Sequence, residues 1–430
     1  MKLFEHQVEV LNQTKGKNKV AYYLDMGLGK TFVGSEKAVS LGDNILVVCQ
    51  KSKINDWVNH FNEHYYCRIY DLSNKKQFEY GIQELTSSVK PITIGVINYE
   101  LAWRRPELLY LKDFTLMLDE SSLIQNSKAK QTKFIMKMNP SNVILLSGTP
   151  VSGKYENLWT QCKLLGWDID EKLFTQHYVQ YDYLKDKRGR KKINPVTNKP
   201  IKVVVGYKNE DRLNKKLKDY GAIFMKTEEV IDLPSKNYID IKVDVTPNYK
   251  KFMKKGIISF DGIDLIGNTP LTKRLYARML CGQYNKAKLD AVRDLLSSAS
   301  DRFLIFYNFN EELDQLINIC DELNRPYSQI NGPVKDLTAY EEDSNSVTLC
   351  HYRAASKGQN LQKADKIIYF TPTDRVEDWM QSQKRIHRIG QESPCFYYLM
   401  KCSSSVEESI YKALEMGVDY TDELFKKEYM

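Results

Sequence analysis

The sequence predicts an α/β protein made of two halves, each a parallel sheet flanked by helices. Short apolar runs alternate with helix-like segments along the chain, which is typical of parallel strands buried on both faces. The runs form two groups, and the stretch Asp232 to Ser235, which contains Pro234, reads as the break between them. A length of 430 residues also favours two or three domains.

The composition indicates a soluble globular protein, with 42% hydrophobic and 27% charged residues. The net charge of +8 permits a polyanionic partner. No apolar run approaches the roughly 18 residues of a membrane span, and the polar N-terminus lacks a signal-peptide core. Eight well-separated cysteines without a C-x-x-C pair favour reduced thiols. We therefore expect a cytoplasmic protein without membrane contact.

In the first half, five apolar runs are predicted strands, each followed by polar residues. Because ligands bind beyond the carboxyl ends of parallel strands, these polar residues predict one shared site. A helical and basic insertion is expected at about 151–232, within a first lobe of residues 1–232. The predicted strands are 20–23, 45–49, 92–97, 114–118 and 143–146.

The second half, residues 233–430, repeats the α/β pattern. Helices are expected at 274–280, 287–296 and 406–416, with a helical segment at about 245–296. Its predicted strands are 303–307, 347–350, 366–370 and 395–399.

The stretch 24–31 (LDMGLGKT) joins the first predicted strand to a helix. Gly27 and Gly29 let backbone N–H groups turn toward a phosphate, and the helix N-terminus adds a favourable dipole. Lys30 would reach the β- and γ-phosphates, and the Thr31 hydroxyl would bind Mg²⁺. The alternative is an ordinary glycine turn, since Leu24 stands where the full phosphate-loop pattern has glycine.

An acidic pair, Asp119-Glu120, follows the strand predicted at 114–118. After a phosphate loop, such a pair indicates that Asp119 binds Mg²⁺ and Glu120 activates the attacking water. The alternative is an exposed pair that caps the next helix. Ser147 and Thr149 follow the next strand, and their hydroxyls can hydrogen-bond the acidic pair and report nucleotide state. A plain turn is the alternative there.

Two basic segments complete the candidate residues. Arg385 and Arg388, three apart within 381–391 (QSQKRIHRIGQ), are expected on one helix face, where arginines can stabilise charge on a transferring phosphoryl group. A basic amphipathic helix is the alternative. The run 185–202 holds eight basic residues. It is either a solvated loop or hairpin, or a protrusion that contacts phosphates through Arg188, Arg190, Lys191 and Lys192.

These motifs, in this order, resemble a superfamily 2 helicase-like ATPase of the Swi/Snf type. Residues 25–31 are similar to that family's phosphate loop, in which the first glycine is routinely absent. Residues 146–150 (LSGTP) match motif III closely, and 385–391 (RIHRIGQ) match motif VI almost letter for letter. Further similarities lie at 3–7, 47–57, 97–100, 224–234, 304–306 and 355–361.

The resemblance implies two RecA-like lobes that bind ATP and Mg²⁺ and track duplex DNA, with lobe closure on ATP bringing in the arginines. It implies that Gln7 contacts adenine, that Gly358 belongs to the nucleotide site, and that Gln381 couples hydrolysis to movement. DNA contacts are implied for Lys51, Ser52, Asn98, Tyr99 and Asn360. Two departures are Ser122, where the family usually has His, and Gln359 in a usually glycine-rich motif. Ser122 remains a coupling candidate.

Three functions stay open. The chain is expected to be a monomeric, minimal motor of phage or bacterial type that moves on duplex DNA. The second reading is a strand-separating DNA or RNA helicase. The third is a nucleotide-gated clamp on DNA or protein with little turnover, which the Ser122 departure keeps open.

Overall fold

Strand β2 (Asn44–Cys49) shows why the first sheet lies inside the protein. Its residues Ile45 to Cys49 are all 0% exposed, so both faces of the strand are covered. A strand with two buried faces needs apolar residues at successive positions rather than at alternate ones. This is the pattern that marked the strands in the sequence.

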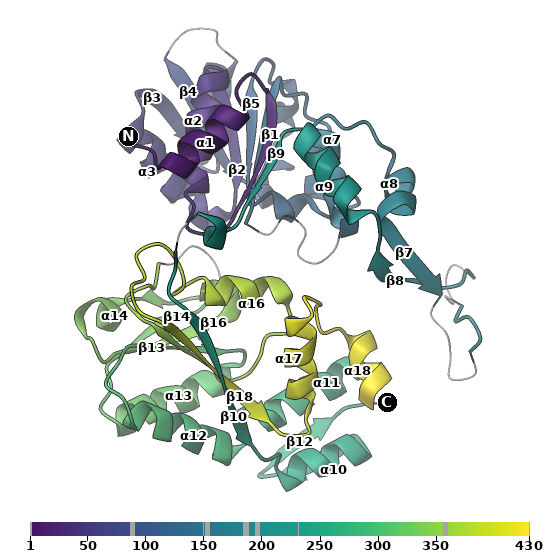
Figure 1. Ribbon diagram of the computed structural model, residues 1–430, viewed down its shortest axis with the longest axis vertical. Helices are drawn as coiled ribbons and strands as arrows, with labels where there is room; N and C mark the ends of the chain where they lie inside the picture. The colour runs from purple at the N-terminus through teal and green to yellow at the C-terminus, as the bar shows by residue number, and fades with distance from the viewer. Residues whose placement is uncertain are drawn as a thin grey trace. The chain divides into compact units, whose positions relative to one another are not determined.

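The computed structural model describes residues 2–86, 91–148, 150, 155–183, 189–193, 198–230, 232–355 and 360–429. The chain divides into two compact units, Met1–Val230 and Ile231–Met430. Figure 1 shows each unit as a central sheet with helices around it. Within the described residues, no helix combines the length and apolar character needed to cross a bilayer. All eight cysteines are free.

Unit 1 contains a sheet of seven parallel strands in the order β3-β4-β2-β5-β6-β1-β9. Helix α2 packs against β1, β5 and β6, whereas α3 and α4 pack near the β3 edge. The strands besides β2 are β1 (Lys19–Leu24), β3 (Cys67–Asp71), β4 (Ile92–Asn98), β5 (Thr115–Asp119), β6 (Asn142–Leu146) and β9 (Ala222–Met225). The longer helices are α1 (Glu5–Gln13), α2 (Lys30–Leu41), α3 (Ile54–His64), α4 (Lys75–Leu85), α8 (Glu171–Tyr178) and α9 (Glu210–Asp219).

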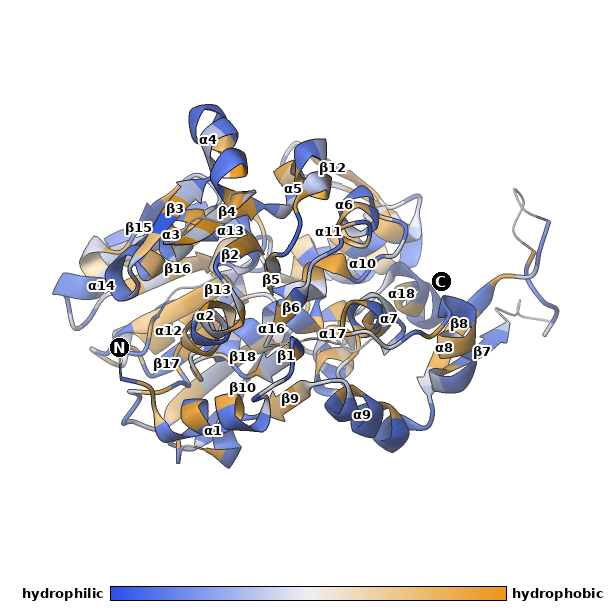
Figure 2. Ribbon diagram, turned by 90° about the horizontal axis from the view of Figure 1, so that it is seen from above, coloured by the Kyte–Doolittle hydropathy of each residue, from blue (hydrophilic) through white to orange (hydrophobic). Residues whose placement is uncertain are grey.

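The segment after residue 151 differs from the predicted insertion in one respect. Strand β9 returns to the first sheet and pairs in parallel with β1. Residues 222–225 therefore belong to the sheet itself. Between them and β6 lie α7 (Trp159–Leu164), α8, the antiparallel hairpin β7 (Val179–Tyr183) and β8 (Lys202–Tyr207), and α9. The hairpin projects beyond the sheet in both Figure 1 and Figure 2.

Unit 2 contains a sheet in the order β10-β18-β17-β13-β16-β14-β15, parallel except for the β14–β15 pair. The strands are β10 (Lys236–Val243), β13 (Phe303–Tyr307), β14 (Tyr327–Ile330), β15 (Lys335–Asp336), β16 (Val347–His351), β17 (Lys366–Tyr369) and β18 (Cys395–Cys402). The longer helices are α10 (Pro247–Lys255), α11 (Pro270–Cys281), α12 (Lys286–Ser297), α13 (Asn310–Glu322), α16 (Val376–Gln383), α17 (Val406–Glu415) and α18 (Asp422–Tyr429).

The segment 245–296 is not wholly helical, contrary to the prediction. A short antiparallel hairpin, β11 (Ile257–Phe260) with β12 (Ile263–Ile266), separates α10 from α11. Each hairpin strand buries a single residue, Ile258 and Leu265, beside the unit 2 core. With that correction, the predicted fold class of two α/β units on largely parallel sheets is confirmed.

Candidate active site in unit 1

Three neighbouring strands of the first sheet place the candidate residues together. β5, β6 and β1 are adjacent, and Asp119 at the end of β5 pairs with Leu146 at the end of β6. The next strand over, β1, pairs Tyr22 with that same Leu146. The loops that follow these strands therefore meet at one edge of the sheet, as the sequence predicted from the carboxyl ends of parallel strands.

The loop from Asp25 to Gly29 wraps around the Lys30 side chain. Lys30 Nζ donates to the carbonyl oxygens of Leu24 at 2.9 Å and Asp25 at 3.2 Å. A Cβ on Gly148 would lie 3.3 Å from the same ammonium, so the neighbouring loop leaves room for it. Lys30 begins the 12-residue helix α2, whose first backbone N–H groups have no partner within the helix. Lysine, glycine-lined space and helix N-terminus together fit a phosphate group.

Gly29 has a positional requirement that the sequence pattern does not show. Its φ is +74°, and a Cβ there would lie 2.1 Å from Gln7 Nε2. Gln7 is buried, donates from Nε2 to the Leu28 carbonyl at 3.2 Å, and accepts from the Phe4 N–H. The structure thus places Gln7 against the phosphate loop, where it holds the loop backbone. A contact between Gln7 and adenine stays a prediction.

Asp119 lies at the end of β5 with two hydrogen-bond donors around it. The Trp57 indole N–H donates to Asp119 Oδ2 at 2.9 Å, and the Tyr99 hydroxyl donates to the Asp119 backbone oxygen at 2.9 Å. Burial raises the pKa of the Asp119 carboxyl, while the Trp57 hydrogen bond and the Lys30 and Lys53 ammonium groups act in the opposite direction. A carboxylate that interacts with the Lys30 charge offers the oxygen ligands that Mg²⁺ prefers.

Glu120 turns away from the strand through a left-handed backbone, with φ of 56°. This conformation is uncommon for a residue other than glycine and is enriched at active sites. Its Oε1 accepts two hydroxyl hydrogen bonds, from Ser147 at 2.8 Å and Ser122 at 3.0 Å. Both predicted coupling serines therefore contact the same carboxylate oxygen. Thr149 lies outside the described residues.

Gln161 of α7 is a buried connector that sequence reasoning missed. Its Oε1 accepts from the Ser121 and Tyr23 hydroxyls, and its Nε2 donates to the Pro150 carbonyl. The side chain is 0% exposed. One amide thus ties the loop after β5 to the loop after β6 and to β1. A lone glutamine in a helix carries no local pattern that would have identified it.

The predicted nucleic-acid contacts of unit 1 divide by exposure. Lys51 and Ser52 are exposed in a short 3-10 turn, η1 (Lys51–Lys53). Asn98 and Tyr99 are only 6% and 1% exposed. The Asn98 amide donates to the Glu100 carboxylate, and the Tyr99 hydroxyl donates to the Asp119 backbone oxygen. Both side chains are therefore buried and hydrogen-bonded within unit 1, and a contact of Asn98 or Tyr99 with nucleic acid stays a prediction.

The described residues of the basic run, 189–193 and 198–202, extend the β7–β8 hairpin. Arg190 and Lys191 are exposed, Lys192 is half-buried, and Arg188 lies outside the described residues. Lys191 Nζ sits 3.9 Å from the centre of the Tyr183 ring. The ladder continues past β7 and β8 through an Ile193–Pro200 bridge and an Ile201 N–H to Lys192 carbonyl hydrogen bond.

The arginines of unit 2 do not lie on one helix face, which corrects the prediction. Helix α16 ends at Gln383, and Arg385 and Arg388 occupy the turns that follow. The Arg385 carbonyl accepts from the Leu361 N–H rather than continuing a helical hydrogen-bond pattern, and Gly390, at the end of these turns, has φ of +89°. Gln391, within the same turns, donates through one amide group to the carbonyls of Gln362, Ala364 and Ile386.

Arg385 and Arg388 differ in accessibility. Arg385 is 0% exposed, and its Nε donates to the Gln381 carbonyl at 3.2 Å. Arg388 is half-buried and donates to Asn360 Oδ1. The Gln381 side chain donates to Glu377. Unit 2 thus brings Arg388 and Asn360 together, whereas Gly358 and Gln359 lie outside the described residues.

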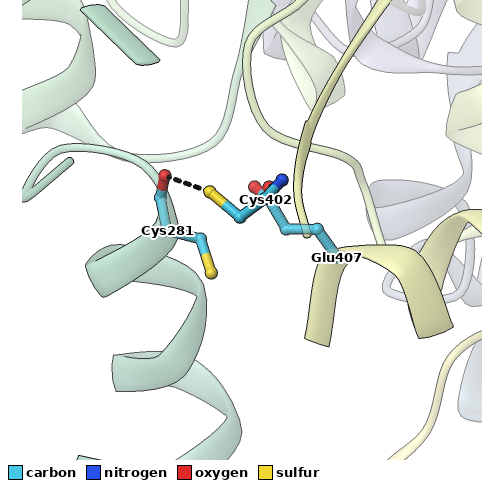
Figure 3. Close-up of side chains that lie close together, drawn as sticks. All are labelled: Cys281, Cys402 and Glu407. Atoms are coloured by element: carbon cyan, nitrogen blue, oxygen red, sulfur yellow. Dashed lines mark hydrogen bonds between the residues drawn. The ribbon is translucent and has the colours of Figure 1, made fainter. Parts of the chain in front are cut away.

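A second cluster, Cys281, Cys402 and Glu407 in unit 2, has the residue types of a metal site (Figure 3). The Cys402 thiol donates to the Cys281 carbonyl at 3.3 Å. Glu407 already accepts from Lys288 Nζ at 2.5 Å and from the Cys402 N–H at 3.0 Å. Burial also raises the pKa of the Cys281 thiol. A lysine that neutralises the only carboxylate makes this cluster a satisfied core ion pair rather than a metal centre.

Comparisons with known proteins agree with the motifs. The family described as SNF2-related domain matches residues 16–284, more than half of the chain, and helicase conserved C-terminal domain matches 287–390. The ISWI chromatin-remodeling complex ATPase ISW1 of Saccharomyces cerevisiae is 24% identical over 92% of this chain and 38% of that protein. The ATP-dependent DNA helicase DDM1 of Arabidopsis thaliana is 23% identical over 90% of this chain and 56% of that protein.

A solved structure, the Sulfolobus solfataricus SWI2/SNF2 ATPase core in complex with dsDNA, is 17% identical with a TM-score of 0.44. That likeness covers 99% of this chain and 92% of the other. The chain spans between 38% and 56% of the length of the curated relatives it matches.

Proposed function

The chain belongs to the SNF2-related domain family, as its motifs predicted, and from this premise we propose that it is a DNA-dependent ATPase that moves along duplex DNA. The observation that carries the proposal is the meeting of Lys30, Asp119, Glu120 and Ser147 at one sheet edge. Nucleotide-binding loops, an acidic pair and a hydroxyl sensor at that edge are the parts that coupled ATP hydrolysis needs.

Each of these residues has a distinct role in the proposed hydrolysis. The α2 N-terminus and the loop amides bind phosphate oxygens, and Lys30 exchanges its loop carbonyls for them. The Thr31 hydroxyl and the Asp119 carboxylate would hold Mg²⁺, which neutralises charge on the phosphates when bound. Glu120 accepts a proton from the attacking water, and its hydrogen bonds from Ser122 and Ser147 orient the carboxylate.

The arginines of unit 2 are proposed to stabilise charge on the transferring phosphoryl group, as the family resemblance implies. Arg388 suits this role better than Arg385, since Arg385 is wholly buried. Among the described residues, Arg388 Nε is a buried donor without a hydrogen-bond partner. A guanidinium with a remaining N–H can donate a hydrogen bond to a phosphate oxygen.

Duplex DNA is proposed to contact exposed polar residues outside the nucleotide site. Lys51 and Ser52 of η1 and Asn360 of unit 2 are exposed, and so are Arg190 and Lys191 on the β7–β8 hairpin. Contacts of this kind to phosphates carry no sequence information, which suits movement along any sequence.

The proposal is tested by measuring ATP hydrolysis with duplex, single-stranded and branched DNA, and with RNA. Duplex DNA should raise the rate. Lys30→Ala should abolish hydrolysis with loss of ATP binding, whereas Glu120→Gln should lower turnover by about 10² to 10⁴ and keep ATP binding. Glu79→Gln, at an exposed position of α4, is the control and should hydrolyse ATP normally. A hydrolysis rate that no nucleic acid changes would contradict the proposal.

The same assays separate the other two functions. Release of a labelled strand from a duplex would indicate strand separation, and RNA stimulation would indicate an RNA helicase. Tight ATP binding with negligible hydrolysis in the presence of DNA would indicate a clamp. The Glu120 geometry favours turnover over a clamp, because Ser122 donates to the catalytic carboxylate despite replacing the family's usual His.

A further inference from the structure

Asp119, the proposed Mg²⁺ ligand, is held from two sides by buried aromatic residues. Trp57 holds the carboxylate through its indole N–H, and Tyr99 holds the backbone oxygen through its hydroxyl, both at 2.9 Å. The two rings are 2% and 1% exposed. Both rings are therefore covered by protein, and the hydrogen bonds to Asp119 are the route by which they can influence hydrolysis in the proposed mechanism.

Trp57 connects Asp119 to an exposed surface over a very short stretch of chain. It lies in the first turn of α3, which begins at Ile54, directly after the η1 turn that carries Lys51 and Ser52. Lys53 at that junction forms an ion pair with Asp56 at 2.7 Å. A displacement of η1 therefore moves the start of α3 and the indole with it.

The Trp57 indole is packed against other residues of α3, so the direction of its N–H depends on the orientation of that helix. The Trp57 ring stacks on Phe61 at 5.7 Å and meets His60 edge-on at 5.9 Å, and both partners lie on α3 itself. Rotation of the indole independent of α3 would break these contacts. On the other side, the Tyr99 hydroxyl fixes the backbone of Asp119. The carboxylate can thus turn while its Cα stays in place.

We propose that Trp57 is a positioning residue that sets the orientation of the Asp119 carboxylate and links nucleic-acid binding at η1 to the metal site. The inference rests on the proposed function, because it requires nucleic acid at Lys51 and Ser52. It assigns a mechanism for DNA stimulation within unit 1 alone: phosphate contact at η1 shifts the start of α3, and the indole N–H carries that shift to Asp119.

The test is Trp57→Phe, which keeps an aromatic ring beside Phe61 but removes the indole N–H donor together with part of the ring volume. A matched control is Trp159→Phe, which removes an equivalent indole N–H that donates to the Ile169 carbonyl at 2.8 Å. Two quantities are measured in each full-length protein: the Mg²⁺ concentration for half-maximal binding of a non-hydrolysable ATP analogue, by calorimetry, and the ratio of hydrolysis rates with and without duplex DNA.

Trp57→Phe should raise the half-saturating Mg²⁺ concentration about tenfold or more, as expected for loss of a hydrogen bond to a charged group. It should also reduce DNA stimulation while the Kd for duplex DNA stays within about twofold. Trp159→Phe should change neither quantity. A general loss of structure would instead weaken DNA binding and lower the thermal midpoint. If Trp57→Phe does not fold, Trp57→Met, which also removes the indole N–H and fills the space with a flexible apolar side chain, carries the test with the same expected direction.

Wild-type Mg²⁺ dependence and wild-type DNA stimulation in folded Trp57→Phe would overturn the inference. This outcome differs from failure of the proposed function, in which the unaltered protein would show no DNA stimulation at all.

Discussion

Glu120 combines an uncommon backbone conformation with a fully engaged carboxylate oxygen. A non-glycine residue at φ of 56° costs roughly 1 to 3 kcal/mol of stability. The hydrogen bonds from Ser122 and Ser147, and the Gln161 amide below them, hold the loop in this state. The strained backbone turns the Glu120 carboxylate away from the direction of β5 and places it next to the loop after β6.

Glu312 is a second carboxylate whose surroundings decide its charge. It is 0% exposed, and burial raises its pKa to about 7 despite hydrogen bonds from the Asn308 and Phe309 N–H groups and the Thr371 hydroxyl. Its other oxygen, Oε1, has no partner among the described residues. A proton on Oε1 is therefore favoured in the folded protein.

This environment predicts a pH-dependent stability. Between an unfolded-state pKa near 4.5 and the folded-state pKa of about 7, the folded protein binds the extra proton, so stability falls as pH rises through this interval. The loss is on the order of 3 kcal/mol when complete. Glu312→Gln, which mimics the protonated acid, should remove this loss. Unfolding midpoints of both proteins from pH 5 to pH 8 measure it, and parallel curves would refute the assignment.

The elements that the sequence predicted well are those whose burial is local and continuous. β2, β5 and β6 are apolar at successive positions because both faces are covered, and this pattern needs no knowledge of partners. β9 and β10 were missed for the opposite reason. β9 has four residues after a long excursion, and β10 is an edge strand that exposes Tyr238 and Ile239 at 49% and 38%.

The residues of the candidate site divide in the same way: those placed by strand ends were predicted, and those placed by long-range packing were not. Lys30, Asp119 and Glu120 were predicted because each follows a strand, and parallel strands bring such ends together. Trp57 and Asp119 are 62 residues apart, so their hydrogen bond depends on how α3 packs. The helix expected around Arg385 and Arg388 is absent because a tertiary hydrogen bond from Leu361 occupies a carbonyl that a helix would use.

The β7–β8 hairpin bears on the two alternatives left open for the basic run, a solvated loop or a protrusion that contacts phosphates. A two-stranded hairpin is only marginally stable by itself, and this one exposes Val205 at 60% and Tyr181 at 45% beside its lysines. Its root is fixed, however, by a Tyr207 to Glu156 hydrogen bond at 2.8 Å. A fixed root together with the exposed Arg190 and Lys191 suits contact with a polyanion.

Reversing two hairpin charges should weaken DNA binding through phosphate contacts. Lys191→Glu with Lys192→Glu should lower duplex affinity at low salt and make the dependence of log K on log salt shallower by about 2. The matched control is Lys254→Glu with Lys255→Glu, two adjacent exposed lysines at the end of α10. Fluorescence anisotropy over a salt series measures both. Equal slopes for the two double variants would indicate that the hairpin lysines only face solvent.

At the scale of the whole molecule, the two units carry complementary parts of the proposed motor. Unit 1 holds the phosphate loop, the acidic pair and the exposed η1 turn, whereas unit 2 holds Arg388 and Asn360. In the proposed mechanism, hydrolysis that needs both units would make their closure depend on ATP, and contacts from each unit to DNA phosphates would convert closure into steps.

Movement along duplex DNA is tested most directly by triplex displacement. A labelled third strand is annealed to one end of a long duplex, and its release is followed with ATP, with a non-hydrolysable analogue, and with Lys30→Ala. The account predicts ATP-dependent release of the third strand while the two duplex strands stay annealed. An intact triplex, despite DNA binding and ATP hydrolysis, would contradict translocation.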